Sequence, residues 1–276
     1  MESSARNDKR RMCPNCRAFI TSDDKVCPYC DQPVGMRVAD QRVVADAMAG
    51  FTQGDQFLTN LILLINAGLY LAMLLYSSNG RGISLDPTGS ALSKFGDKDG
   101  YAIRIGLQWW RLITAGFLHG NIWHILMNSY SLWMVGPAIE AVFGTSRYVV
   151  IYFVATITGF AASLYFSPYA SVGASAAISG LIGALLGLAI RERNSVIGRQ
   201  KNRIVQVALL TLLPGFIIPL PIDNWAHIGG FLGGFVVAYV TGSRGSGRDE
   251  VWKTLAWVSV AVTAYAFFRM TQQLVG

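Results

Sequence analysis

Two stretches of the sequence decide the fold: Gly173-Ala174-Ser175-Ala176-Ala177-Ile178-Ser179-Gly180 and Trp225-Ala226-His227-Ile228-Gly229-Gly230-Phe231-Leu232-Gly233-Gly234. Each opens an apolar run of helical length, and small residues recur in each at every fourth position. Residues four apart share one face of a helix, so each run carries a flat stripe that permits close approach of another backbone. We therefore expect these two helices to pack together, with Ser175 and His227 at the same end.

The composition indicates that these runs lie in a membrane. Hydrophobic residues make up 52% of the 276 residues and charged residues 14%, against about 25% charged residues in soluble domains, and the mean hydropathy is +0.38. These figures exclude a soluble globular domain, a disordered chain and a coiled coil. Seven apolar runs approach the roughly 20 residues that cross a bilayer. They cover residues 58–76, 113–135, 148–166, 173–190, 204–220, 225–240 and 252–268.

The positive charges predict an orientation. Of the 23 Lys and Arg residues, 17 lie in the amino-terminal arm and in every second loop after it. Cytoplasmic loops carry such an excess, so we expect the amino terminus in the cytoplasm and the carboxyl terminus on the other side of a plasma (inner) membrane. The net charge of +7 then follows from topology. The lipid bilayer is the expected partner, and no nucleic acid is expected.

All four cysteines lie near the amino terminus, in Cys13-Pro14-Asn15-Cys16 and Cys27-Pro28-Tyr29-Cys30. Ten residues separate the two pairs, a spacing that lets two tight turns present four thiolates to one Zn²⁺. Two disulfides or a redox-active pair are the alternatives, which a cytoplasmic location disfavours. We predict one structural zinc in a zinc-ribbon-like segment over residues 1–35, followed by a linker over residues 36–56. The sequence does not indicate what the ribbon binds.

A group of polar residues lies in the second apolar run. Asn121 is placed to start a helix, and His124 and Asn128 then share one helical face, with His119 just before it. Polar side chains are costly in a bilayer, so this face should look towards other helices. The group is either a structural hydrogen-bond network or part of a site.

Ser175 and His227 have the residue types of a nucleophile and its general base. At equal depth on closely packed helices they can form the hydrogen bond that this chemistry requires. The N–H of Ser175 at a helix start, together with Asn128 and His124, can donate to an oxyanion. We interpret Asp223, four residues before His227, as a helix cap and not as a third catalytic member.

Five patterns occur in a fixed order: Trp110-Arg111, HxxxxHxxxN from His119 through His124 to Asn128, GxxxExxxG around Glu140, Gly173-Ala174-Ser175, and Ala226-His227-xx-Gly230-xxx-Gly234. Together they resemble the rhomboid family of intramembrane serine proteases. The resemblance implies an all-α polytopic membrane protein with a six-helix core over residues 57–245 and a seventh, carboxy-terminal transmembrane helix over residues 246–276, preceded by the small zinc ribbon.

The same resemblance implies roles for individual residues. Ser175 and His227 would form a catalytic dyad that needs no cofactor, and Asn128 and His124 would line its oxyanion hole. Trp110 and Arg111 would belong to a structured first loop, and Glu140 would help to hold that loop. Ala176 and Ser179 depart from the family pattern, since Gly and an aromatic residue are frequent at these positions.

The expected function is cleavage of transmembrane segments in single-span membrane proteins, near the non-cytoplasmic side. The alternative is a non-catalytic relative that binds or dislocates transmembrane helices, although such relatives lose the serine or the histidine. Transport is a second alternative function. The substrate sites of a transporter would lie near the centres of the membrane spans, whereas the polar residues here lie towards one face of the membrane.

Overall fold

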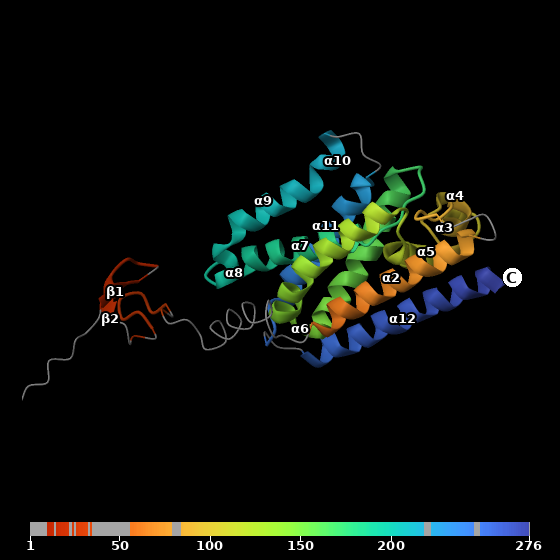
Figure 1. Ribbon diagram of the computed structural model, residues 1–276. Helices are drawn as coiled ribbons and strands as arrows, with labels where there is room; N and C mark the ends of the chain where they lie inside the picture. Colours follow the sequence, from red (N-terminus) through yellow and green to blue (C-terminus); the bar gives the residue numbers. More distant parts are fainter. Residues whose placement is uncertain are drawn as a thin grey trace, which may run out of the picture. The chain divides into compact units, whose positions relative to one another are not determined.

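The computed structural model describes residues 10–13, 15–21, 24, 26–32, 34, 56–78, 84–217, 222–245 and 249–275. The chain divides into two compact units, Met1–Ala45 and Asp46–Gly276. Figure 1 shows the strands of the first unit in red and the helices of the second unit from orange to blue.

The first unit contains a two-stranded antiparallel sheet. β1 (Arg10–Met12) pairs with β2 (Phe19–Thr21), and Met12 lies opposite Phe19. Its small core consists of Cys13, Ile20, Cys27 and Val34. A core of this size does not stabilise a fold without a metal or a cross-link.

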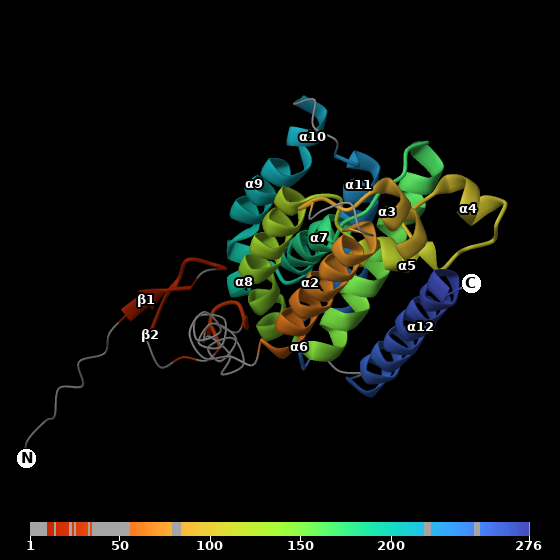
Figure 2. The same cartoon turned by 45° about the vertical axis from the view of Figure 1, so that its right-hand side comes forward.

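The second unit is a helical bundle, seen from a second direction in Figure 2. Its main helices are α2 (Phe57–Ser78), α6 (Ile122–Phe166), α7 (Ser175–Arg191), α9 (Lys201–Leu212), α11 (Asn224–Thr241) and α12 (Asp249–Val275). We call residues 84–121 the first loop; it contains α3 (Gly89–Phe95), α4 (Gly100–Arg104), α5 (Arg111–Thr114) and the 3₁₀ turn η1 (Ala115–Phe117). The short helices α8 (Val196–Arg199) and α10 (Pro214–Ile217) flank α9.

Among the described residues, α2, α6 and α12 are long and apolar enough to cross a membrane. α6 is a helical hairpin, because Gly144 has φ 75° and ψ 161° between two helical limbs. A positive φ favours glycine, so the chain reverses at this residue. With the limbs of α6 counted separately and α9 taken with α10, the predicted fold of a six-helix core and a seventh helix is confirmed. The predicted apolar runs end at residue 135 and resume at residue 148, which implies a loop between them. That prediction is wrong, since residues 136–147 are helical on both sides of Gly144.

The second span starts later than predicted. Helix was expected from Ile113, but η1 ends at Phe117 and Leu118 is extended, with φ −91° and ψ 155°. α6 begins only after Asn121, whose Oδ1 accepts the N–H of His124 at 2.8 Å. Residues 113–118 are buried inside the first loop. Hydropathy alone does not distinguish such residues from a membrane helix.

α9 and α10 form an interrupted and loosely packed span. Only Ile204 and Ala208 of α9 are buried, and α9 packs mainly on α7. α9 ends at Leu212 and a new helix begins at Pro214, because proline cannot supply the N–H that would continue the hydrogen-bond ladder. Two further prolines, Pro219 and Pro221, lie outside the described residues.

α7 and α11 pack with their backbones in contact, as predicted from their small residues. A Cβ atom on Gly230 would overlap the carbonyl oxygen of Ala176, and one on Gly234 would overlap the carbonyl oxygen of Gly180. Ala176 and Ala226 also share one buried cluster. The first turns of the two helices therefore lie side by side.

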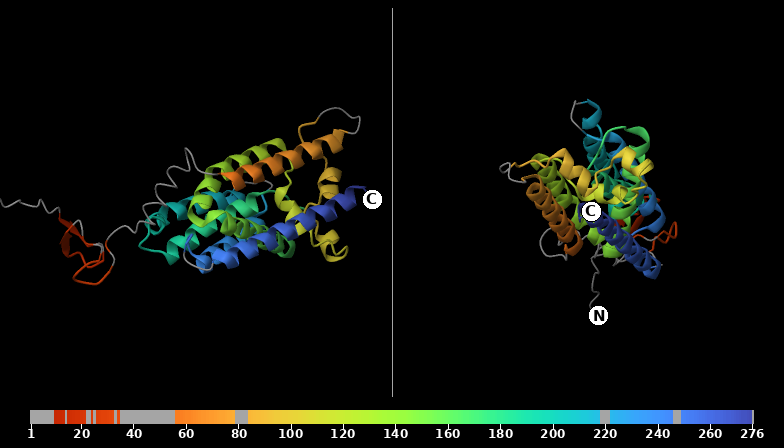
Figure 3. Two further views of the ribbon diagram at one scale, coloured as in Figure 1. Left: turned by 90° about the horizontal axis from the view of Figure 1, so that it is seen from below. Right: turned by 90° about the vertical axis from the view of Figure 1, so that its right-hand side faces the viewer.

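α12 lies at the edge of the bundle (Figure 3) and is attached near both ends. Near its start, Asp249 Oδ1 accepts a hydrogen bond from the buried Arg147 at 2.7 Å. Near its end, Gln273 Nε2 donates to the carbonyl oxygens of Ser93 at 3.1 Å and Lys94 at 3.2 Å. The carboxy-terminal helix thus holds the first loop.

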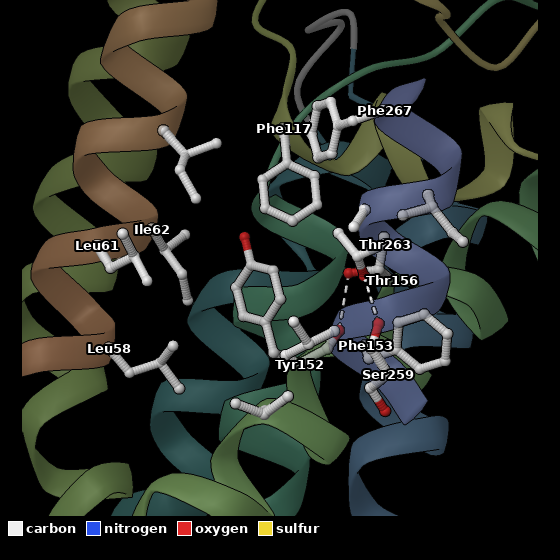
Figure 4. Close-up of a pocket in the computed structure, with 15 residues that line it drawn as sticks. Leu58, Leu61, Ile62, Phe117, Tyr152, Phe153, Thr156, Ser259, Thr263 and Phe267 are labelled. Atoms are coloured by element: carbon white, nitrogen blue, oxygen red, sulfur yellow. Dashed lines mark hydrogen bonds between the residues drawn. The ribbon is translucent and has the colours of Figure 1, made fainter. Parts of the chain in front are cut away.

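An apolar cavity of about 280 Å³ lies between α2, α6 and α12. Figure 4 shows Leu58 of α2, Tyr152 of α6 and Phe267 of α12 on its walls. The hydroxyls of Thr156 and Thr263 donate to carbonyl oxygens of their own helices at 2.7 and 2.8 Å, so they add little polarity. No lining residue belongs to α7 or α11. The cavity is therefore separate from the contact between those two helices.

The packing of α7 on α11 predicts the effect of a single added methyl group. Gly234→Ala should lower the free energy of unfolding by about 1–3 kcal/mol, because the new Cβ overlaps a backbone carbonyl that cannot rotate away. Gly68→Ala in α2 is the matched control, since nothing lies within 4 Å of its Cβ position. Thermal unfolding in detergent measures both variants. Equal melting temperatures would contradict the close contact.

Candidate active site and metal centre

Ser175 is the first residue of α7. The preceding residue, Ala174, has helical φ and ψ, and no side chain caps the helix. The N–H of Ser175 therefore has no acceptor within the helix, and the helix dipole adds partial positive charge at this end. The Ser175 side chain is half-buried. An anionic oxygen beside it would meet an unused backbone donor.

Gly173 brings the serine next to α6. Its φ of +132° lies in the region that favours glycine, and its N–H donates to Ala115 O in η1 at 2.9 Å. A Cβ atom on Gly173 would lie 2.6 Å from His124 Nε2 and 3.4 Å from Ser175 Oγ. The imidazole of His124 and the hydroxyl of Ser175 therefore border the same small space.

The polar face of α6 points to this space. Asn128 is buried, and its Nδ2 donates to His124 O at 3.0 Å, which leaves its second N–H available. His119 is fully buried, with its ring 5.1 Å from the ring of His124 in edge-to-face geometry. The structure thus brings His124 to the start of α7, with His119 against its ring and Asn128 one turn further along the same face of α6.

His227 is the fourth residue of α11 and lies one turn from the contact of Gly230 with Ala176. This register sets the His227 turn beside the Ser175 turn. His227 Nδ1 has no hydrogen-bond partner among the described residues, Ser175 included. Catalytic hydrogen bonds are often long without substrate, so this does not exclude the pair.

Asp223 caps α11, as predicted. Its Oδ1 accepts the N–H of Ala226 at 3.0 Å, and Oδ2 accepts from the hydroxyl of Ser163. His227 Nδ1 is buried without a hydrogen-bond partner among the described residues. The carboxylate of Asp223 therefore orients the helix and not the imidazole.

Ser179 follows Ser175 by one turn of α7. Its side chain is buried, and its hydroxyl forms no hydrogen bond with a described residue. The structure thus has a small buried hydroxyl at a position where the family pattern often has an aromatic residue.

The first loop is structured, as predicted for Trp110 and Arg111, and both side chains are buried. Arg111 Nη1 forms an ion pair with Asp97 at 2.9 Å, and Nη2 donates to Ser93 O at 2.9 Å. Burial raises the pKa of Asp97, and the positive charge of Arg111 opposes this change. Asp97 was not predicted from the sequence, although a buried guanidinium requires a carboxylate nearby.

The prediction that Glu140 holds the first loop is wrong. Glu140 Oε1 accepts the N–H of Leu58 at 3.4 Å and the hydroxyl of Thr145 at 3.3 Å. These contacts lie at the start of α2, at the opposite end of the bundle from the first loop. A carboxylate at a helix start is stabilised by the unpaired N–H groups there.

The four cysteines form one cluster, with all sulfur atoms within 4.8 Å of one another. Sγ of Cys13 is 3.8 Å from Sγ of Cys30, and Sγ of Cys16 is 3.6 Å from Sγ of Cys27. Ligands in a tetrahedral zinc centre, with Zn–S of about 2.3 Å, lie about 3.8 Å apart. Backbone hydrogen bonding by Cys16 lowers the pKa of Cys13 to about 6, and burial raises the pKa of Cys27. The cluster can hold a metal ion.

The sequence model of the rhomboid domain matches residues 106–244. The chain belongs to the rhomboid family. With its apolar helices, this makes it an integral membrane protein. The match covers α6, α7 and α11, which carry His124, Asn128, Ser175 and His227.

Three curated rhomboid relatives are informative. Rhomboid protease GluP of Bacillus subtilis (strain 168) is 43% identical over 151 residues, which is 55% of this chain and 29% of that protein. RHOMBOID-like protein 7 of Arabidopsis thaliana is 35% identical over 161 residues, 56% of this chain and 50% of that protein. Inactive RHOMBOID-like protein 8 of Arabidopsis thaliana is 34% identical over 151 residues, 54% of this chain and 42% of that protein. This rhomboid chain thus spans half or less of these three relatives.

Proposed function

We propose that this rhomboid chain is an intramembrane serine endopeptidase with Ser175 as nucleophile and His227 as general base. One observation supports this most directly. The close contact of α7 and α11 sets the first turns of both helices side by side, and His124 of α6 borders the same space as Ser175. The similarity to rhomboid protease GluP supports the same reaction class.

The chemistry follows from the roles of these groups. Ser175 Oγ attacks the scissile carbonyl carbon while His227 takes its proton, and His227 then returns that proton to the leaving amine. The second N–H of Asn128, the ring of His124 and the N–H of Ser175 donate to the oxyanion of the tetrahedral intermediate. Water then hydrolyses the ester on Ser175, with His227 again as base. No cofactor takes part in these steps.

Ser175→Ala and His227→Ala should each abolish cleavage of a labelled single-span substrate by the purified protein, because the two residues act as a unit. Asn128→Ala should lower kcat by about 10²-fold through the loss of one oxyanion donor. Ser259→Ala is the matched control. It removes a buried hydroxyl that, among the described residues, donates to Leu255 O in α12. This variant should cleave at the rate of the wild type.

Residual turnover in Ser175→Ala would contradict the assignment of the nucleophile. Full activity of Asn128→Ala would remove that residue from the oxyanion hole. If the wild-type chain binds transmembrane helices but never cleaves them, the non-catalytic alternative holds. The similarity to a relative named inactive keeps that alternative under test.

The proposed substrates are single-span membrane proteins cut near the non-cytoplasmic side. α7 has 17 residues and rises about 26 Å, less than the roughly 30 Å of the hydrocarbon core. Ser175 at its start therefore lies below the membrane surface. The Lys and Arg distribution supports a cytoplasmic amino terminus in the plasma membrane, which sets Ser175 near the opposite face.

Substrates should carry weak helix formers just inside that face, because the carbonyl of a helical residue is hydrogen-bonded and shielded. Mass spectrometry of the products from a model substrate with Gly and Pro near the cut locates the scissile bond. Replacing those residues with Leu should slow cleavage severalfold, whereas Leu substitutions at the other end of the same helix should not. A cut at the cytoplasmic end would overturn this account.

We propose that the cysteine cluster binds one structural zinc ion. Cys13, Cys16, Cys27 and Cys30 supply the ligands, and the small core around them supports a role for the metal in folding. Elemental analysis should find one zinc per chain, and joint Cys13→Ser and Cys16→Ser substitution should release it. Asn15→Ser, between the same two ligands, should retain it. A native protein with two disulfides and no metal would refute the proposal.

A further inference from the structure

Lys98 is an unusual residue of the first loop, because its charged side chain is completely buried. Lysine is almost never fully buried unless its ammonium group is paired. It lies between α3 and α4, and no sequence pattern singles it out. Neither the ion pair of Arg111 nor the proposed catalytic step uses it.

The hydrogen bonds that Lys98 forms with described residues reach one segment, residues 167–171, which leads from α6 to α7. Its Nζ donates to Ser167 O at 2.9 Å and to Tyr169 O at 2.7 Å. Its backbone pairs with Ser171 in both directions, with N···O distances of 2.9 and 3.2 Å. One side chain and one backbone bridge therefore fasten this segment to the first loop.

The fastened segment ends four residues before Ser175. Between them, Gly173 is held by Ala115 O at 2.9 Å and has no room for a Cβ atom beside His124. The chain between Ser171 and Ser175 thus has little freedom to adjust. A shift at Ser167 or Tyr169 would be transmitted to the start of α7.

Burial lowers the pKa of Lys98, while the negative charges of Asp223, Asp99 and Asp97 oppose this change. The ammonium group is held directly by the two carbonyl oxygens of the segment before Ser175.

We propose that Lys98 is a positioning residue for Ser175: its buried ammonium group and its backbone fix the segment that leads to the start of α7. The first loop then sets the position of Ser175 relative to His227, in addition to covering the site. This inference rests on the proposed protease function.

The test compares Lys98→Met with Lys94→Met in the full-length protein. Methionine keeps an unbranched apolar chain and removes the ammonium group. Lys94 is the matched control, since it lies in the same loop and donates to a carbonyl oxygen, that of Gln273 in α12, at 3.3 Å. The readouts are melting temperature, kcat and KM for a single-span substrate, and the rate at which a fluorophosphonate labels Ser175.

Lys98→Met should lower kcat and the labelling rate together by about ten- to hundredfold, with KM within twofold, because small displacements of reacting groups have effects of this size. Lys94→Met should keep both rates within twofold. If Lys98→Met does not fold, Lys98→Gln serves instead. Its side-chain amide can still donate to one carbonyl oxygen, and it should lower the labelling rate by a smaller factor than Lys98→Met.

A lower melting temperature with an unchanged labelling rate in Lys98→Met would overturn the proposal and leave Lys98 a purely structural residue. So would equal kinetics in the Lys98 and Lys94 variants. Failure of the protease proposal is distinguishable, because the wild-type protein would then neither cleave the substrate nor react with the probe at Ser175.

Discussion

Contact between the backbones of α7 and α11 is the constraint on which the site depends. Ordinary helices pack 8–10 Å apart, whereas these two meet where Gly230 faces the carbonyl of Ala176 and Gly234 faces the carbonyl of Gly180. Helices in lipid gain no hydrophobic free energy by associating, so shape and close packing must hold them together. A short serine side chain and an imidazole on facing turns come within reach only if the backbones are this close.

The first loop supplies the second constraint. A helix start with unpaired N–H groups is useful for chemistry only if the chain before it is held in place. Here Gly173 bonds Ala115 O and Ser171 pairs with Lys98, while Arg111 and Asp97 hold the loop itself together. Gln273 of α12 adds an attachment from the carboxyl end of the chain. Polar bonds, together with the buried cluster of Ala115, Phe160, Ala176 and Ala226, therefore fix the end of the bundle where Ser175 lies.

Features with a local physical cause could be predicted from the sequence. The stripes of small residues predicted the contact of α7 with α11, and Asn121 and Asp223 were recognised as helix caps from their position before apolar runs. The two CxxC pairs predicted the cysteine cluster. Each of these depends on spacing along a few turns of chain, which the sequence displays directly.

Features that depend on the tertiary arrangement could not be predicted. Residues 113–118 are as apolar as a membrane helix but are buried in the first loop, and the hairpin at Gly144 turns within one residue where a loop was expected. Glu140 lies in a family-like pattern, yet its partners are at the start of α2. Lys98 looks like any loop lysine, because its burial is produced by carbonyl groups about 70 residues away. No local signal reports such partners.

The central claim is that close packing of α7 on α11, with α6 alongside, builds one reactive serine site. A crystal structure of the protein after reaction with a fluorophosphonate tests it most directly. Phosphorus should be bonded to Ser175 Oγ, and His227 should lie within hydrogen-bond distance of that oxygen. A phosphonyl oxygen should lie about 3 Å from both the Ser175 backbone nitrogen and the Asn128 amide nitrogen. Phosphorus on another residue, or on Ser175 with its oxygen turned away from Asn128 and His227, would contradict the account.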